Sequence, residues 1–167
     1  AQGDVAGAVR LLAQAVADAP SDPAAHYGYA QALWQAGDRD QALSQYQEAG
    51  RLSPQTLSYR ADTARALVAM GRKAEAIEEL EAAVAIEPGP GPLQSLASLY
   101  AEEGNPGRPL DTLRRAATVA PNSAIIQQDY AHALEKAGNT AQAIEAYQKV
   151  IESDANYIIL ATPPGFR

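Results

Sequence analysis

The chain of 167 residues contains no cysteine and only one phenylalanine, one methionine and one tryptophan. The lack of cysteine excludes a disulfide framework, a thiol nucleophile and a cysteine-based zinc site. Bulky side chains are scarce although 47% of the residues are hydrophobic, because alanine supplies much of that fraction. We therefore expect closely approaching helices rather than a core of large side chains.

Basic residues are also in the minority. Thirteen Lys and Arg side chains stand against twenty Asp and Glu side chains, which gives a net charge of −7. No basic cluster is present that could follow a phosphate backbone, so we expect no nucleic-acid partner. The chain also lacks a run of about eighteen apolar residues, so we expect no direct membrane span.

One pattern of small, aromatic and helix-ending residues recurs along the chain. Its anchors are Gly37, Ala42, Tyr46, Ala49 and Pro54, which return in the same order and at the same spacing as Gly71, Ala76, Leu80, Ala83 and Pro88. Apolar residues between the anchors follow three- and four-residue steps, as half-buried helices require. The interval from Gly37 to Gly71, about 34 residues, is typical of helix-turn-helix repeats.

Laid along the whole chain, the pattern defines its organisation. We expect the second helix of a truncated repeat at 1–22, whose partner helix would lie upstream, then repeats at 23–56, 57–89, 90–123 and 124–156, then a non-repeat tail at 157–167. The tail matches no part of the repeat, and Pro163 and Pro164 cannot continue a helix. We expect it to be extended or to begin another domain rather than to form a cap.

The helix ends of the first repeat carry specific signals. Asp22 is expected to cap the first helix, with Pro23 at its first position. Gly37 is expected to close the same helix in the left-handed conformation.

The third repeat is irregular. The step from Gly71 to Gly104 is shorter by one than the step from Gly37 to Gly71, so one residue has been lost, and a run of prolines and glycines replaces an ordinary turn. We expect a hinge between two stiffer halves at this run, which comprises Pro88, Gly89, Pro90, Gly91 and Pro92. Pro109 replaces the alanine of the other repeats, and we expect it in a first helical turn, where it removes no intrahelical hydrogen bond.

These anchors resemble the tetratricopeptide repeat, whose pattern is Trp-x2-Leu-Gly-x2-Tyr, then Ala-x3-Phe, then Ala and Pro. The first repeat carries it as Tyr29-Ala30-x2-Leu33, Ala42-x3-Tyr46, Ala49 and Pro54. The resemblance covers residues 3–156 and implies an all-α, right-handed superhelical solenoid. The leading Trp of the pattern is replaced by His26, Arg60, Leu93 and Gln127, and we expect the first helices to pack less firmly at these outer ends.

The resemblance also implies a scaffold that binds a protein or peptide partner through the concave surface formed by the first helices. By register, the expected contact residues are Tyr27, Gln31, Trp34, Arg65, Gln94, Gln128 and His132. Trp34 has two interpretations, because a large ring can anchor a ligand or cover a gap between alanine-rich repeats. Arg65 can hold a carboxylate in a bidentate contact or pair with Asp62 in its own helix.

Catalytic and metal sites find no support in the sequence. Acidic pairs such as Glu78-Glu79 fall on helix surfaces, without a nucleophile or a phosphate-binding loop beside them. The two histidines, His26 and His132, are more than a hundred residues apart. We expect no enzyme activity, no cofactor and no metal.

The abundance of Ala, Gln and Gly with little Lys is similar to the tetratricopeptide regions of bacterial periplasmic proteins that assemble or export exopolysaccharide, cellulose included. We therefore expect part of a larger bacterial assembly, in the periplasm rather than the cytoplasm. The alternative is a regulatory or substrate-recruiting domain fused to a catalytic or membrane module outside this sequence. Apolar faces at the open ends of the array would also permit self-association.

Overall fold

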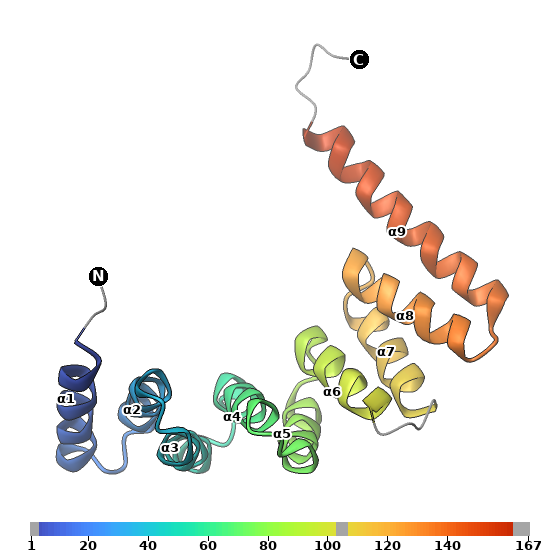
Figure 1. Cartoon of the computed structure of the whole chain (residues 1–167). Helices are drawn as coiled ribbons and strands as arrows, with labels where there is room; N and C mark the ends of the chain where they lie inside the picture. The colour runs from blue at the N-terminus through green and yellow to red at the C-terminus, as the bar shows by residue number, and fades with distance from the viewer. Residues whose placement is uncertain (1–3, 103–106, 162–167) are drawn as a thin grey trace. The chain divides into compact units, whose positions relative to one another are not determined.

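The structure, a computed structural model, describes residues 4–102 and 107–161, with side chains described as far as Glu152. Within these residues the chain forms nine α-helices and no strand, which confirms the all-α class (Figure 1). The helices are α1 (Val5–Asp18), α2 (Pro23–Ala36), α3 (Arg39–Leu52), α4 (Leu57–Ala69), α5 (Lys73–Ile86), α6 (Pro90–Glu102), α7 (Gly107–Val119), α8 (Ala124–Lys136) and α9 (Thr140–Ala161).

The helices belong to two compact units, Ala1–Glu87 (unit 1) and Pro88–Arg167 (unit 2). In unit 1 each helix packs against the next one along the chain, from α1 to α5. In unit 2 the same order runs from α6 to α9. Each unit is therefore built from neighbouring helices in contact, which is the arrangement of a repeat solenoid.

The ends of α2 form as the sequence predicts. The Asp22 carboxylate accepts a hydrogen bond of 2.9 Å from the Ala24 amide, and Pro23 is the first helical residue. Gly37 ends the helix with φ of 90°. Only glycine adopts this left-handed conformation without steric cost, so the prediction for Gly37 is confirmed with its physical reason.

Alanines occupy the closest contacts between helices. Ala30 of α2 and Ala42 and Ala49 of α3 have no exposed surface, and the corresponding alanines of α4 and α5 are buried as well. In unit 2 a buried cluster of α8 and α9 comprises Ala131, Leu134, Ala143 and Ala146. Small side chains let the helix axes approach, which explains how a chain with few bulky residues buries a core.

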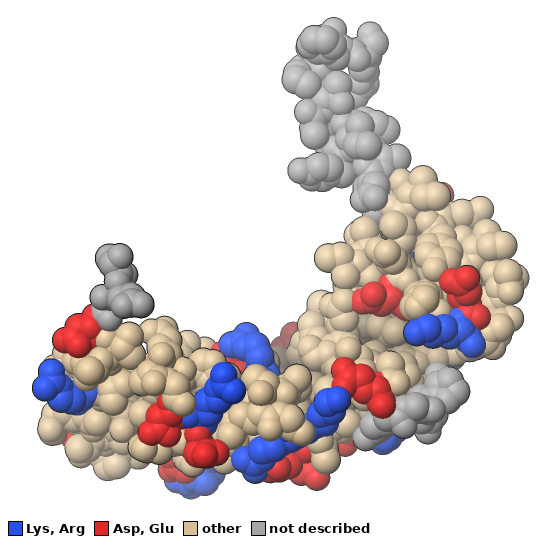
Figure 2. Space-filling view, in the orientation of Figure 1, with Lys and Arg blue, Asp and Glu red and all other residues tan. Residues whose placement is uncertain are grey.

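Figure 2 shows basic and acidic side chains interspersed along the visible side of unit 1, without a large patch of either sign. In the described part of the chain, no helix has both the length and the apolar character that crossing a membrane requires.

Three residues of the expected hinge are helical. The helix α6 begins at Pro90, so Pro90, Gly91 and Pro92 form its first turn. The Leu93 amide donates the first hydrogen bond of that helix, 3.2 Å long, to the Gly89 carbonyl. Prolines are tolerated here because the first amides of a helix have no intrahelical partner. The segment between α5 and α6 is therefore shorter than predicted, and the hinge itself stays a prediction.

The prediction for Pro109 is confirmed. The helix α7 begins at Gly107, so Pro109 is its third residue and lies in the first turn, where it is buried. The preceding anchor, Gly104, lies outside the described residues.

The end of the last repeat at 156 stays a prediction, whereas the expected extended conformation directly after it is wrong. The helix α9 continues to Ala161, five residues beyond the predicted boundary at 156. Residues 140–161 contain neither proline nor glycine, so nothing in this segment breaks a helix once it has begun. The predicted tail is thus helical in its first five residues, and 162–167 lie outside the described residues.

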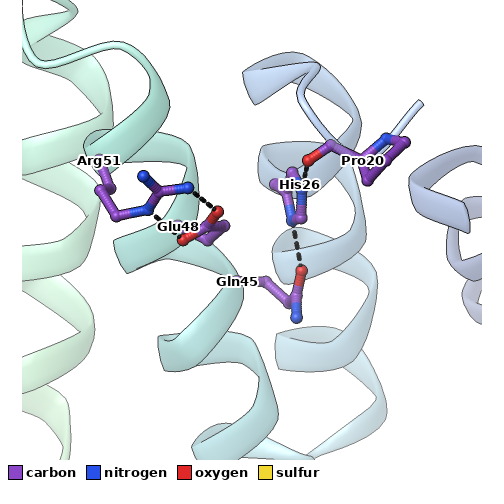
Figure 3. Close-up of polar contacts among 5 residues, drawn as sticks. All are labelled: Pro20, His26, Gln45, Glu48 and Arg51. Atoms are coloured by element: carbon purple, nitrogen blue, oxygen red, sulfur yellow. Dashed lines mark hydrogen bonds and ion pairs between the residues drawn. The ribbon is translucent and has the colours of Figure 1, made fainter.

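The expectation of loose packing at the outer ends of the first helices is also wrong. His26 is only 6% exposed, and its Nε2 donates to the Pro20 carbonyl at 3.0 Å (Figure 3). Its Nδ1 lies 2.7 Å from Oε1 of Gln45 in the second helix of the same repeat. A polar side chain can replace the tryptophan of the family pattern because both ring nitrogens have partners.

The same hydrogen bond recurs in two other repeats. Arg60 Nε donates to the Pro54 carbonyl at 3.3 Å, and Gln127 Nε2 donates to the Pro121 carbonyl at 3.1 Å. In all three cases the acceptor is the proline six residues earlier, and we call this contact the proline link. The third repeat has Leu93 at this position, and its residue six positions earlier is Glu87 because one residue was lost. The apolar Leu93, fully buried, needs no such partner.

Candidate functional site

Tyr27 connects the first helices of two neighbouring repeats in unit 1. Its hydroxyl on α2 donates a short hydrogen bond to the Asp62 carboxylate on α4. The Tyr27 ring lies 4.9 Å from the Tyr59 ring and 5.7 Å from the Tyr46 ring, centroid to centroid. These contacts from α3 and α4 fix the ring, so Tyr27 has one preferred orientation in the array.

The hydrogen bond also changes the acidity of Tyr27. Because its hydroxyl donates to the negatively charged Asp62, and because the ring is partly buried, the pKa of Tyr27 is raised to about 12. Burial likewise raises the pKa of the neighbouring Tyr46. Both phenols are therefore neutral hydrogen-bonding groups at physiological pH.

Arg65 completes this arrangement one helical turn after Asp62. Its Nη2 lies 2.5 Å from the second carboxylate oxygen of Asp62. The Asp62 side chain is only 13% exposed, whereas the Arg65 side chain is 76% exposed. The pairing within the helix that the sequence suggested is thus present, and the exposed guanidinium retains further N–H donors.

Gln31 lies four residues after Tyr27 and Trp34 three residues after Gln31, so all three lie on the same side of α2. Gln31 is exposed and Trp34 is half-buried. The Arg39 guanidinium of α3 lies 5.6 Å from the centroid of the Trp34 ring, within the range of a cation–π contact. Half-burial leaves part of the ring accessible, so both interpretations of Trp34 stay open. Val68, one turn after Arg65 on α4, is 41% exposed. We call Tyr27, Gln31, Trp34, Asp62, Arg65 and Val68 the unit 1 face.

The other predicted contact residues belong to unit 2. Gln94 Nε2 of α6 donates to the Asp129 carboxylate of α8 at 2.5 Å. His132, one turn after Asp129, has a 59% exposed side chain, and its Nδ1 lies 3.7 Å from the Glu135 carboxylate. Gln128 is exposed on the same helix. The seven predicted residues therefore form two sets, one in each unit.

The sequence did not reveal Asp62 as the partner of Tyr27, or Asp129 as the partner of Gln94. A signal for them exists, because the spacing from Tyr27 to Asp62 is the same as the spacing from Gln94 to Asp129. The repeat period alone does not show it, since each bond joins positions that are one residue out of register with the repeat.

A separate hollow in unit 1 contains none of the predicted residues. It is lined by Gln47, Gly50, Arg51, Pro54, Arg60, Thr63 and Glu79. Its two guanidinium groups are already paired, Arg51 with Glu48 at 2.5 Å and Arg60 with Glu79 at 3.0 Å (Figure 3 shows the first pair). The hollow therefore offers a ligand no uncompensated charge.

Metal binding has no geometric basis in what the structure describes. Over residues 4–102 and 107–161, no three His, Asp or Glu side chains are placed to share one ion.

Solved structures with similar folds include several repeat proteins at low sequence identity. MamA residues 41 to the end from Desulfovibrio magneticus RS-1 is 20% identical, with a TM-score of 0.74 over 93% of this chain and 88% of that chain. YrrB, a TPR protein with an unusual peptide-binding site, is 19% identical, with a TM-score of 0.71 over 86% and 75%. A kinesin light chain-like repeat protein of Podospora anserina is 22% identical, with a TM-score of 0.68 over 93% and 89%.

A comparison with curated protein sequences found no match. Models of the tetratricopeptide repeat, in contrast, match residues 1–61, 33–100 and 125–157, which is most of the chain. The helix pairs and their alanine contacts agree with that assignment. The chain therefore belongs to the tetratricopeptide repeat family and is an all-α scaffold of that type.

Proposed function

We propose that the unit 1 face binds an extended segment of a partner protein. The observation that carries the proposal is the connected arrangement of Tyr27, Asp62 and Arg65 across two first helices. It fixes a tyrosine ring and an exposed guanidinium relative to each other before any partner arrives. Side chains that are already ordered lose less conformational entropy on binding, so such a face binds more tightly than a mobile one.

The residues of this face supply different contacts. The accessible part of Trp34 offers apolar surface for a large side chain of the partner. Gln31 offers an amide that can donate to and accept from an extended backbone. The outward nitrogens of Arg65 can hold a carboxylate of the partner. A segment with an acidic residue beside an apolar one satisfies all three.

Membership in a family of interaction scaffolds supports this proposal, as does the unusual peptide-binding site of the structurally similar YrrB. The experiment is affinity capture with the intact protein, repeated with Trp34→Ala and Arg65→Ala. Arg114→Ala is the matched control, because Arg114 forms an equally local pair with Asp111 at 2.8 Å on a second helix. We expect both face variants to lose captured protein and the control to retain it. Unchanged capture by both face variants would overturn the choice of face.

We further propose that the partners belong to a bacterial multi-component assembly such as polysaccharide synthesis or export, with the protein in the periplasm. The support is the residue composition described above. Mass spectrometry of the captured proteins tests this proposal. Partners confined to the cytoplasm would contradict it and leave the binding face unaffected.

Self-association is a second proposal, carried by exposed apolar side chains on α1 and α9. Leu11 is 75% exposed, and Ile144 and Ile151 are 53% and 68% exposed. Burying such side chains between copies would be favourable. Light scattering over a range of protein concentrations tests it, and a strictly monomeric protein would exclude it.

A further inference from the structure

The helices α4 and α8 present corresponding rows of outward residues. On α4 the row is Ser58, Ala61, Arg65 and Val68, and on α8, two repeats later, it is Ile125, Gln128, His132 and Glu135. Within each row the residues are three or four positions apart, so they lie on one side of the helix. Each helix also receives a hydrogen bond from the first helix before it, through Tyr27 to Asp62 and through Gln94 to Asp129.

The two rows carry opposite charge. On α4 the exposed charge is the Arg65 guanidinium, because the nearby Asp62 is 13% exposed and is covered by its two partners. On α8 the exposed charge is the Glu135 carboxylate, whose side chain is 64% exposed and lies 3.7 Å from Nδ1 of His132. Asp129 adds a second, half-buried negative charge one turn before His132.

The contacts around Glu135 leave it accessible to a ligand. The Tyr147 hydroxyl of α9 donates to Oε2 of Glu135 at 3.3 Å, which orients the carboxylate. Lys136 is the next residue, but one residue corresponds to about 100° around a helix, so it does not extend the row. At the opposite end of the row Ile125 is 65% exposed. The row thus combines an oriented carboxylate with an apolar side chain about 15 Å away.

We propose that the α8 row is a second binding face, which takes a protein segment carrying Lys or Arg near an apolar side chain. Its ligand is therefore opposite in charge to the segment that suits Arg65 in unit 1. The inference rests on the proposed function, because it assumes that first-helix faces of this array bind protein segments. Complementary charge selects the partner and excludes segments of the wrong sign.

Two short fluorescent peptides and the full chain test this inference. One peptide carries a lysine flanked by leucines, and the other carries a glutamate in place of the lysine. Binding is measured by fluorescence anisotropy at about pH 8, where histidine is neutral. Glu135→Gln is expected to reduce the affinity for the lysine peptide by up to about fivefold, the range of an exposed ion pair. Ile125→Ser is expected to reduce the same affinity.

Glu145→Gln is the matched control, because it removes the same charge from an exposed position of α9. Glu145→Gln should not change the affinity for the lysine peptide. Glu135→Gln should not change the affinity for the glutamate peptide, which is expected to bind at Arg65. If Glu135→Gln and Glu145→Gln reduced the affinity for the lysine peptide equally, the inference would be overturned. Binding of the glutamate peptide without the lysine peptide would overturn it while preserving the proposed function. Failure of both peptides to bind would overturn both proposals.

Discussion

The Tyr27 hydroxyl donates to the Asp62 carboxylate and so joins the first helices of two consecutive repeats. In unit 2, Gln94 donates to Asp129 across the same spacing along the chain. A tyrosine and a glutamine thus perform the same linking role in the two units. In both cases a polar residue expected to contact a ligand also helps hold neighbouring repeats together.

Replacing Tyr27 by phenylalanine tests that structural contribution. We expect Tyr27→Phe to lower the free energy of unfolding by about 1 kcal/mol, because it removes a hydrogen bond to a charged acceptor at a half-buried position. Urea denaturation measures the change. Tyr29→Phe, on the same helix and also half-buried, is the control and should have a smaller effect. Equal losses in the two variants would contradict the importance of the Asp62 contact.

The same contact predicts how stability depends on pH. The pKa of Tyr27 is raised from 10.0 to about 12 by the hydrogen bond to Asp62 and by burial, so the folded state favours the protonated phenol. This contribution to stability is complete below about pH 10 and is lost as the pH rises toward 12. Ultraviolet absorbance of tyrosinate, taken as the difference between wild type and Tyr27→Phe, measures the ionisation. Ionisation of Tyr27 near pH 10, with helicity by circular dichroism still intact, would contradict the prediction.

The proline link predicts opposite preferences at equivalent positions. Gln127→Leu should destabilise the protein by about 1 kcal/mol, because the Pro121 carbonyl loses its donor. Leu93→Gln should destabilise it by about 2 kcal/mol, because it places an amide at a fully buried site with Glu87 in place of the proline. Chemical denaturation of both variants measures these changes. If Leu93→Gln were as stable as the wild type, the one-residue deletion in the third repeat would not be the reason why leucine occupies position 93.

The sequence predicts the parts of this fold that depend on local chemistry. Asp22, Pro23 and Gly37 determine helix ends through their own backbone and side-chain preferences, and the structure agrees at each. The repeated alanines predict close helix contacts, because the size of a side chain limits how near two helices can come. Pro109 is predicted correctly because proline has few permitted positions in a helix.

The features that the sequence does not predict are of two kinds. Some depend on contacts between helices, and others involve residues that suit more than one local structure. The partnership of Tyr27 with Asp62 depends on the spacing and rotation of two helices, which a repeat pattern does not specify. In the sequence, His26 only departs from the family pattern. The structure shows that it is held by contacts with Pro20 and Gln45. Pro90 begins a helix although its neighbours suggest a turn, because proline suits both places.

Two glycines of unit 1 are expected to respond in opposite ways to the same substitution. Gly37→Ala should destabilise the protein by about 1 kcal/mol, because φ of 90° is unfavourable for a residue with a Cβ atom. Gly50→Ala should stabilise it by about 0.5 to 1 kcal/mol, because Gly50 is helical and its added Cβ would meet no atom within 4 Å. Urea denaturation of both variants measures the difference. If both substitutions changed the free energy of unfolding in the same direction, the left-handed conformation at position 37 would not be the reason for the glycine there.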